Sequence, residues 1–165
     1  MRSTGRWRPP LSSSEPRDLW QEIALDAERE GSLWREALRP RGARDRELVF
    51  SPLTEERFAL AVETIYEGYL AHYGRPRLFS PPDRDTALLL GDYLYAQGLV
   101  HLAATGSVDA VRELAELISL CVHLRGQDDP GDGEAWASTV EGLGGGPADG
   151  AARRRALAAH AGRVG

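Results

Sequence analysis

The segment from Thr86 to Ala104 constrains the fold most, because it would form a helix that is apolar on most of its sides. Its large apolar side chains are Leu88, Leu89, Leu90, Tyr93, Leu94, Leu99, Val100 and Leu102. A helix of this kind is normally buried, so the segment predicts a central helix that other helices cover. Asp83 or Asp85 is available to cap its start, and Gly106 with Ser107 marks a short corner after its end.

A second apolar repeat follows this corner directly. At spacings of three and four it contains Val111, Leu114, Ala115, Leu117, Ile118, Cys121 and Val122, and it ends at Gly126. Two helices of this length joined by a short corner form an antiparallel hairpin. We therefore expect the segments on either side of Gly106 to lie against each other.

Two earlier segments also have helical spacing. The first has a break at Gly31, stops at Pro40 and contains Leu19, Trp20, Ile23, Ala27, Leu33, Trp34, Ala37 and Leu38. The second follows a charged linker and restarts at Ser51, with an apolar face formed by Phe58, Ala61, Val62, Ile65, Tyr69 and His72. Pro76, Pro81 and Pro82 then break the chain into a loop.

Both ends of the chain differ from this helical part. Residues 1–13 are rich in Arg, Ser and Pro and are predicted to be disordered. Residues 128–165 are rich in Gly, Ala and Asp and are predicted to be a low-complexity, mostly disordered tail, in which Ala151 to Ala161 forms at most a marginal helix. The sequence thus predicts an all-α domain over residues 14–127, a small bundle of about four helices with disordered termini.

Composition limits the classes of function. The chain has 165 residues and a formal charge of −5, which argues against a nucleic-acid surface. All 20 basic residues are arginine, a bias typical of a GC-rich bacterium. Cys121 is the only cysteine, so no intrachain disulfide forms and a reducing cytoplasm is the expected location. Residues 1–10 contain arginines but no following apolar run, so we do not expect them to be a secretory signal, and no run of the sequence is long enough to predict a transmembrane segment.

Two runs of residues together resemble the trans-isoprenyl diphosphate synthase (polyprenyl synthetase) family. They are Ala61-Val62-Glu63-Thr64-Ile65-Tyr66-Glu67-Gly68-Tyr69-Leu70-Ala71-His72 and Gly91-Asp92-Tyr93-Leu94-Tyr95-Ala96. In that family a helix reading roughly AVE-x-IH-xxS-LIH runs into an aspartate-rich DDxxD motif, and a later helix opens with LLAGDYLLA. The resemblance covers residues 58–127 and implies part of the synthase fold. It also implies structural roles for Glu63, His72, Gly91, Asp92 and Tyr93, with Asp92 as a cap or a buried hydrogen-bonding group.

The resemblance lacks the family's metal motif. In the family the aspartates hold Mg²⁺, which neutralises the departing pyrophosphate. Here His72 is followed by Tyr73-Gly74-Arg75-Pro76-Arg77, in which Gly74-Arg75-Pro76 is similar to the family's RRG-x-P loop. The resemblance therefore implies a scaffold without catalytic residues, metal ligands or a cofactor, and no prenyl transfer by this chain alone.

Other acidic patterns have a catalytic and a structural interpretation. Asp128-Asp129-Pro130-Gly131-Asp132 spells DDxxD, but Pro130 and Gly131 oppose the helix that such a motif needs, so a loop or linker is predicted. Glu63 and Glu67 lie one helical turn apart and have the spacing to share a metal. Two carboxylates alone more often form a solvated or arginine-paired face.

The remaining reactive side chains have no catalytic pattern. His72, His101 and His123 do not have a ligand spacing, which predicts histidines in the interior or at its boundary. Cys121 lies on an apolar face and is predicted to be a small core residue.

The apolar segment from Thr86 to Ala104 also bears on partners. Three companion helices cannot cover it on every side, which predicts a homo- or hetero-oligomer. Candidates for the interface or the core are Leu88, Leu89, Leu99, Val100, Trp20 and Trp34. Two interpretations remain open: a non-catalytic subunit of a catalytic polyprenyl diphosphate synthase in isoprenoid biosynthesis, or an independent helical interaction or regulatory module with no isoprenoid role.

Overall fold

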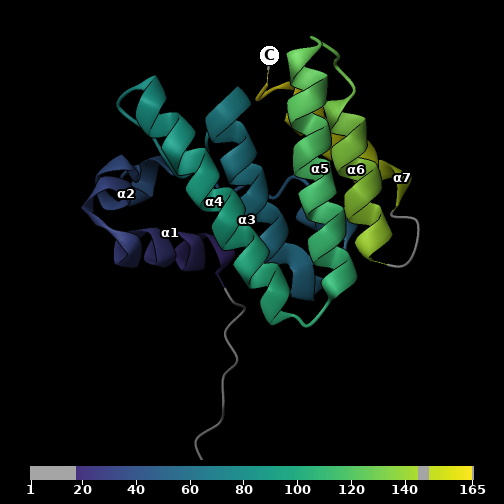
Figure 1. Cartoon of the computed structure of the whole chain (residues 1–165), viewed down its shortest axis with the longest axis horizontal. Helices are drawn as coiled ribbons and strands as arrows, with labels where there is room; N and C mark the ends of the chain where they lie inside the picture. The colour runs from purple at the N-terminus through teal and green to yellow at the C-terminus, as the bar shows by residue number, and fades with distance from the viewer. Residues whose placement is uncertain (1–17, 145–148, 165) are drawn as a thin grey trace, which may run out of the picture.

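The computed structural model describes residues 18–144 and 149–164, and within them the chain is all-α (Figure 1). The α-helices are α1 (Leu19–Glu30), α2 (Ser32–Ala37), α3 (Glu56–Tyr73), α4 (Arg84–Ala104), α5 (Val108–Gly126), α6 (Asp132–Leu143) and α7 (Gly150–Ala161). Two short 3₁₀ turns, η1 (Arg41–Ala43) and η2 (Ser51–Leu53), lie between α2 and α3. The all-α prediction is confirmed, but the described part has seven α-helices instead of about four. The predicted disordered segment 1–13 lies outside the described residues.

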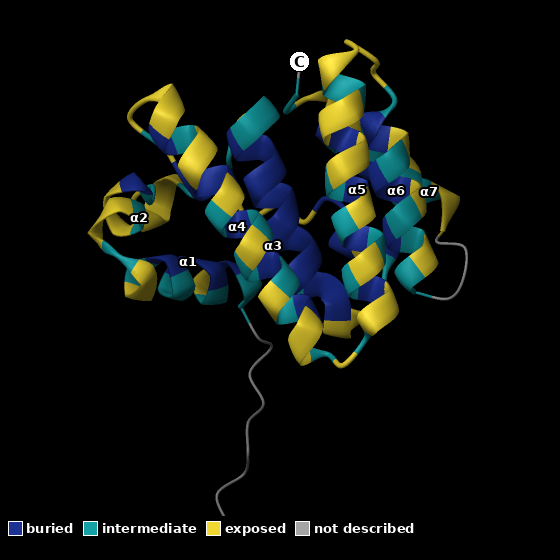
Figure 2. Ribbon diagram, viewed as in Figure 1, coloured by how far each residue is buried: buried dark blue, intermediate teal, exposed yellow. Residues whose placement is uncertain are grey.

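The central helix is α3, not α4. Every residue of α3 from Ala61 to Ala71 is buried, and Figure 2 shows the helix almost entirely in the colour of buried residues. On α4 only one stripe is buried, formed by Thr86, Leu90, Gly91, Leu94, Gly98 and Leu102. The burial expected of α4 is therefore limited to this stripe, in agreement with the prediction that its companion helices cannot cover it on every side. The physical reason is that α4 packs chiefly on α3, and none of the described helices lies against its outer side.

The first two helices form one side of the molecule. Asp18 caps α1 by accepting hydrogen bonds from the Trp20 and Gln21 amides, at 3.1 and 3.2 Å. The predicted break at Gly31 separates α1 from α2. After α2, an isolated antiparallel bridge between Leu38 and Phe79 joins the linker to the loop between α3 and α4.

Both long later helices begin with a side-chain cap, of which the one at the start of α4 was predicted. Asp83 accepts a hydrogen bond from the Thr86 amide at the start of α4, and Ser107 accepts one from the Ala110 amide at the start of α5. The predicted corner between α4 and α5 contains Gly106, whose φ of +79° is a conformation that glycine adopts without strain. The two helices diverge from this corner (Figure 1).

The last two helices differ most from the sequence prediction. Residues 128–165 were expected to be a mostly disordered tail, yet α6 and α7 form there and contribute to the main core. Trp136 of α6 has no exposed surface and stacks on Phe50 with ring centroids 5.3 Å apart. These short, glycine- and alanine-rich helices are held by packing of α6 on α5 and α7 and by contacts with the tyrosines of α3, which the local composition does not reveal.

Close packing between α3 and α4 yields a stability prediction. A Cβ added at Gly68 of α3 would lie 2.9 Å from the Gly91 carbonyl oxygen and 3.0 Å from the Leu94 Cβ, both on α4. We expect Gly68→Ala to lower the free energy of unfolding by about 1–3 kcal/mol, because the helices must separate to admit the methyl group. Urea denaturation followed by circular dichroism measures this change.

Gly126 provides the matched control. It lies in the last turn of α5, and an added Cβ there meets no atom within 4 Å. Gly126→Ala should leave stability unchanged or raise it, since alanine favours a helix. Equal effects of the two substitutions would contradict the proposed close packing.

Candidate functional site

The most deeply buried charges connect α3 to the loop that follows it. The Arg77 guanidinium donates from Nη1 to Glu63 Oε2 at 2.6 Å and from Nε to Glu67 Oε2 at 3.0 Å. The Arg77 side chain is 1% exposed and both carboxylates are 0% exposed. Charges removed from water to this degree are stable only when they are paired and hydrogen-bonded.

The other oxygens of these carboxylates bind the backbone. Glu63 Oε1 accepts hydrogen bonds from the Val49 and Ser51 amides at 3.1 and 3.0 Å. Glu67 Oε1 accepts one from the Leu78 amide at 2.7 Å. Each of the four carboxylate oxygens therefore has a donor, and both glutamates are committed to holding the fold. Of the two sequence interpretations, these contacts correspond to arginine pairing.

Arg77 has further partners on all sides. Its Nη1 also donates to the Glu47 carbonyl at 2.9 Å, and its guanidinium carbon lies 4.5 Å from the Trp20 ring centroid and 5.0 Å from that of Tyr66. Burial alone would lower the pKa of Arg77, but the carboxylates of Glu63 and Glu67 outweigh it and raise the pKa. Arg77 is thus a permanent cation within the core.

This network gives a second stability prediction. Arg77→Met leaves two buried carboxylates without a counter-charge, so we expect a loss of about 3–5 kcal/mol in the free energy of unfolding. Adding Glu63→Gln and Glu67→Gln to Arg77→Met should recover part of the loss, because the neutral amides keep their backbone contacts. Urea denaturation compares the two variants. If the triple variant were no more stable than Arg77→Met, unpaired charge would not be the cause.

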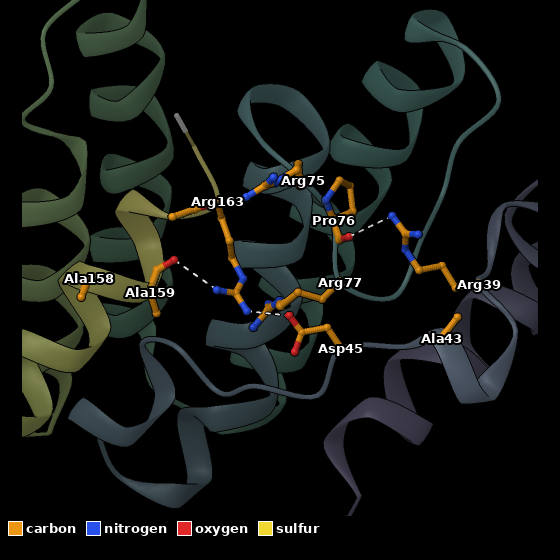
Figure 3. A pocket seen from close by; sticks show the side chains of 10 residues that line it. Arg39, Ala43, Asp45, Arg75, Pro76, Arg77, Ala158, Ala159 and Arg163 are labelled. Carbon is orange, nitrogen blue, oxygen red and sulfur yellow. Dashed lines mark hydrogen bonds and ion pairs between the residues drawn. The ribbon is translucent and has the colours of Figure 1, made fainter.

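An arginine-lined hollow lies beside this network (Figure 3). We call it the first hollow; its volume is about 510 Å³, and its lining residues are Arg39, Ala43, Asp45, Arg75, Pro76, Arg77, Ala158, Ala159, Gly162 and Arg163. They come from the linker after α2, the loop between α3 and α4, and the end of α7. Three distant parts of the chain therefore build one surface.

A second hollow of about 520 Å³ adjoins the first, since Arg75, Gly162 and Arg163 line both. Its other lining residues are Ala71, His72, Tyr73, Gly74, Arg84 and Ala87. Arg163 pairs with Asp45 and Glu47, each at 2.6 Å. Arg39 and Arg75 donate to the carbonyls of Pro76 and Gly162 instead.

The charges in these hollows are unevenly compensated. Among the described residues, Arg39, Arg75 and Arg84 form no ion pair with a carboxylate. Asp45 is the one acidic residue in the linings, and Arg163 already engages it. The surface can therefore bind negatively charged groups.

A larger and more apolar hollow of about 940 Å³ lies between α1, η2, α3 and the end of α4. Leu19, Leu48, Leu60 and His101 are among its lining residues. It has no concentration of charge comparable to that of the first two hollows.

A second buried polar cluster connects α3 to the C-terminal helices. Asp132 accepts hydrogen bonds from the Tyr69 hydroxyl and from Arg125, whose Nη2 lies 2.6 Å from the carboxylate. On α7, His160 Nδ1 lies 3.0 Å from the Tyr66 hydroxyl, and His160 Nε2 lies 3.4 Å from Asp132. Residues 128–131 lie in the turn between α5 and α6, as the loop prediction for this stretch requires, whereas Asp132 is buried as the first residue of α6.

Charge and burial have opposite effects in this cluster. Burial would raise the pKa of Asp132, but the Tyr69 hydroxyl, His160 and Arg125 outweigh it and lower the pKa. Burial lowers the pKa of His160 and prevails over the opposing effect of Asp132. The folded protein therefore favours an ionised Asp132 and a neutral His160.

His160 makes stability depend on pH. Because its folded pKa is below the unfolded value of about 6.5, the unfolded chain binds the proton more tightly. The stabilising contribution is present above that unfolded value and is lost as the pH falls through the folded pKa. Thermal unfolding should therefore occur at a lower temperature at about pH 5.5 than at about pH 7.5.

The substitution His160→Gln tests the source of this dependence. It should reduce the difference between the two unfolding temperatures without abolishing it, because burial also lowers the pKa of His72. His123→Gln, at an exposed position on α5, is the control and should keep the full difference. An unchanged difference in His160→Gln would assign the pH dependence to other groups.

The tryptophan and tyrosine candidates lie around α1 and α4. Trp20 is buried in a core cluster, and its indole nitrogen donates to the Arg46 carbonyl at 2.9 Å. Trp34 is half-buried and stacks on Tyr93, with ring centroids 5.4 Å apart. Burial raises the pKa of Tyr93 to about 12. These three residues are packing groups within the chain.

His72, Gly91 and Asp92 lie together between α3 and α4. Gly91 leaves room for the imidazole, since a Cβ at Gly91 would collide with His72. His72 Nε2 lies 3.2 Å from Asp92 Oδ1, whose side chain is 73% exposed. The expectation that Asp92 is a cap or a buried hydrogen-bonding group is therefore wrong, because it lies on the outer face within α4.

The leucine and valine candidates divide between two environments. Leu99 is partly buried and packs against the main core, whereas Leu88, Leu89 and Val100 are exposed on α4. Cys121 is buried as predicted, and burial raises the pKa of its thiol to about 12. No group of His, Cys, Asp and Glu within residues 18–144 and 149–164 is arranged to hold a metal ion.

The sequence prediction missed four residues that organise these sites. Arg77 was recognised only as part of a loop. Its ion pairs have a signal in the sequence, because an arginine in a loop follows a helix that has two glutamates one turn apart. Trp136 and Val140 have the i, i+4 spacing of a buried helix face, which indicated α6. Arg163 follows α7 and has no comparable signal in the sequence.

Comparisons with protein-family models, curated proteins and solved structures found no match to this chain. The resemblance to polyprenyl synthases stays a prediction from the residues. None of the described helices is long and apolar enough to cross a membrane.

Proposed function

We propose that the chain is a non-catalytic helical subunit that binds a partner protein through the outer face of α4. The observation that carries this proposal is the exposure of apolar side chains on a helix whose opposite face is packed. Leu89 is 56% exposed and Val100 is 61% exposed, and Leu88 lies beside Leu89. Leu89 and Val100 lie about three turns apart on the exposed side of α4, and exposed apolar groups distributed along one helix side in this way are typical of protein interfaces.

The state of the carboxylates supports a non-catalytic role. Metal-assisted prenyl transfer requires carboxylates that are free to bind Mg²⁺. Glu63 and Glu67 are occupied by Arg77, and Asp132 is occupied by Tyr69 and Arg125. These contacts favour a structural use of the acidic residues near α3.

The proposed partner is a catalytic polyprenyl diphosphate synthase. This part of the proposal rests on the resemblance, whose two runs lie on α3 and α4. The run Ala61 to His72 forms the buried part of α3, and the run Gly91 to Ala96 packs against it near Gly68. A protein that keeps this helix pair without a metal site fits the role of an accessory subunit.

Co-expression with a synthase encoded beside this gene tests the proposal. The two proteins should co-purify, and Leu89→Asp with Val100→Asp should prevent it, because an interface would then bury unpaired charges. Light scattering of the purified mixture measures the complex directly. The variant chain should keep its helical circular dichroism, since both positions are exposed in the single chain.

Leu33→Asp is the matched control. Leu33 is 44% exposed and lies on α2, so it is not one of the α4 residues that the proposal names, and its substitution should leave the complex intact. Binding that survives the α4 substitutions would contradict the proposed interface. If no synthase binds but other proteins are captured through the α4 face, the chain is an independent interaction module with no isoprenoid role.

A further inference from the structure

We propose that the two arginine-lined hollows bind the acidic turn between α5 and α6 of a second copy of this chain. On one copy the contact uses Arg39, Arg75 and Arg84, and on the other it uses Asp128 and Asp129. Although Arg84 begins α4, the contact uses none of the exposed apolar side chains of that helix.

The basic half of the contact is a surface on which the arginines outnumber the carboxylates that could neutralise them. The chain as a whole carries a formal charge of −5, yet Arg39, Arg75 and Arg84 lie in adjoining hollows without a carboxylate partner among the described residues. Like charges placed close together repel each other, and an oppositely charged group that enters the hollows removes the repulsion. The surface is therefore complementary to an acidic segment.

The spacing of the arginines favours several carboxylates over a single small anion. Figure 3 shows Arg39 and Arg75 reaching the first hollow from different sides, with Pro76 between them. Hydrogen bonds to the carbonyls of Pro76 and Gly162 hold these two guanidinium groups at separate points. One phosphate group needs donors that converge on it, whereas separated guanidinium groups suit separate carboxylates.

The acidic half of the contact is the turn that spells the start of DDxxD in the sequence. Asp128 and Asp129 are exposed, and neither carboxylate pairs with a cation within the described part of the chain. The turn is held by hydrogen bonds from the Asp128 amide to Arg125 O at 3.3 Å and from the Asp129 amide to Leu124 O at 2.9 Å. Its carboxylates are therefore presented by an ordered backbone, which lowers the entropy lost on binding.

Both halves of the contact lie at the same end of the molecule. The helices α3, α4 and α5 run up, down and up, so the ends of α3 and α5 are at one end (Figure 1). Two copies related by a two-fold axis and placed end to end can each insert a turn into the other. Such a reciprocal contact closes into a dimer and does not extend into a fibre.

The experiment measures self-association of the full chain by sedimentation velocity at two salt concentrations. Contacts between exposed charges weaken with ionic strength, so we expect a dimer at about 20 mM salt that dissociates at about 500 mM. Asp128→Asn with Asp129→Asn, and separately Arg39→Gln with Arg84→Gln, should each weaken the low-salt dimer by about tenfold or more. Asp109→Asn with Glu116→Gln removes the same charge elsewhere on α5 and should leave the dimer unchanged.

A charge exchange identifies the pairing. Chains with Asp128→Arg and Asp129→Arg should be monomeric alone, as should chains with Arg39→Glu and Arg84→Glu, while a mixture of the two should form a mixed dimer. Wild-type chains that stay monomeric at low salt, or a mixture that fails to associate, would overturn the proposal. A dimer that resists salt and is lost with Leu89→Asp and Val100→Asp would also overturn it and would assign self-association to the α4 face.

Discussion

The arrangement of the helices around α3 depends on the buried ion pairs that Arg77 forms. Through one side chain it holds Glu63 and Glu67 of α3, the Glu47 carbonyl of the linker and the ring of Trp20 in α1. A buried ion network of this kind contributes little stability over a well-packed apolar core, because the charges lose their hydration. Its effect here is on specificity, since only one position of the loop satisfies both carboxylates.

The same principle governs the rest of α3. This helix is buried along its length, yet it carries Glu63, Tyr66, Glu67 and Tyr69. These groups take their partners from three parts of the chain. Glu63 and Glu67 share one partner in the loop before α4, Tyr66 takes its partner from α7, and Tyr69 takes its partner from the start of α6. The buried polar groups of the central helix thus select which segments surround it, while apolar burial supplies the driving force.

The sequence predicted the long helices well because their signals are local. Apolar residues at three and four, together with caps such as Asp83 and Ser107, mark α4 and α5 without knowledge of any neighbour. Local signals of this kind do not predict which apolar helix faces are buried and which stay exposed. The composition of α4 suggested that this helix would be buried. Burial depends on how many other segments pack against a helix, and most of them pack against α3 and not against α4.

The candidate sites were harder to predict than the helices. Glu63 and Glu67 were identified as a pair, but Arg77 completes the pair from beyond the end of α3. The arginine-lined hollows combine Arg39, Arg75 and Arg163, which are far apart in the sequence and come together only through the packing of α7 near the linker. The helix α6 was missed, and α7 was expected only as a marginal helix over Ala151 to Ala161. Both are rich in alanine and glycine, and what holds them is packing on other parts of the chain, among them α5 and the tyrosines of α3.

The burial of Trp136 has a consequence for how the protein is made. Phe50, Tyr66 and Tyr69 form the aromatic surface that Trp136 covers, and all three are synthesised long before it. While the ribosome is still translating α4 and α5, Trp136 has not yet been made, so this aromatic surface is exposed to water or to chaperones that bind nascent chains. The core is therefore closed only when the carboxyl-terminal helices have been made. A stalled or prematurely terminated chain leaves these aromatic side chains exposed to solvent and becomes a substrate for chaperones and proteases.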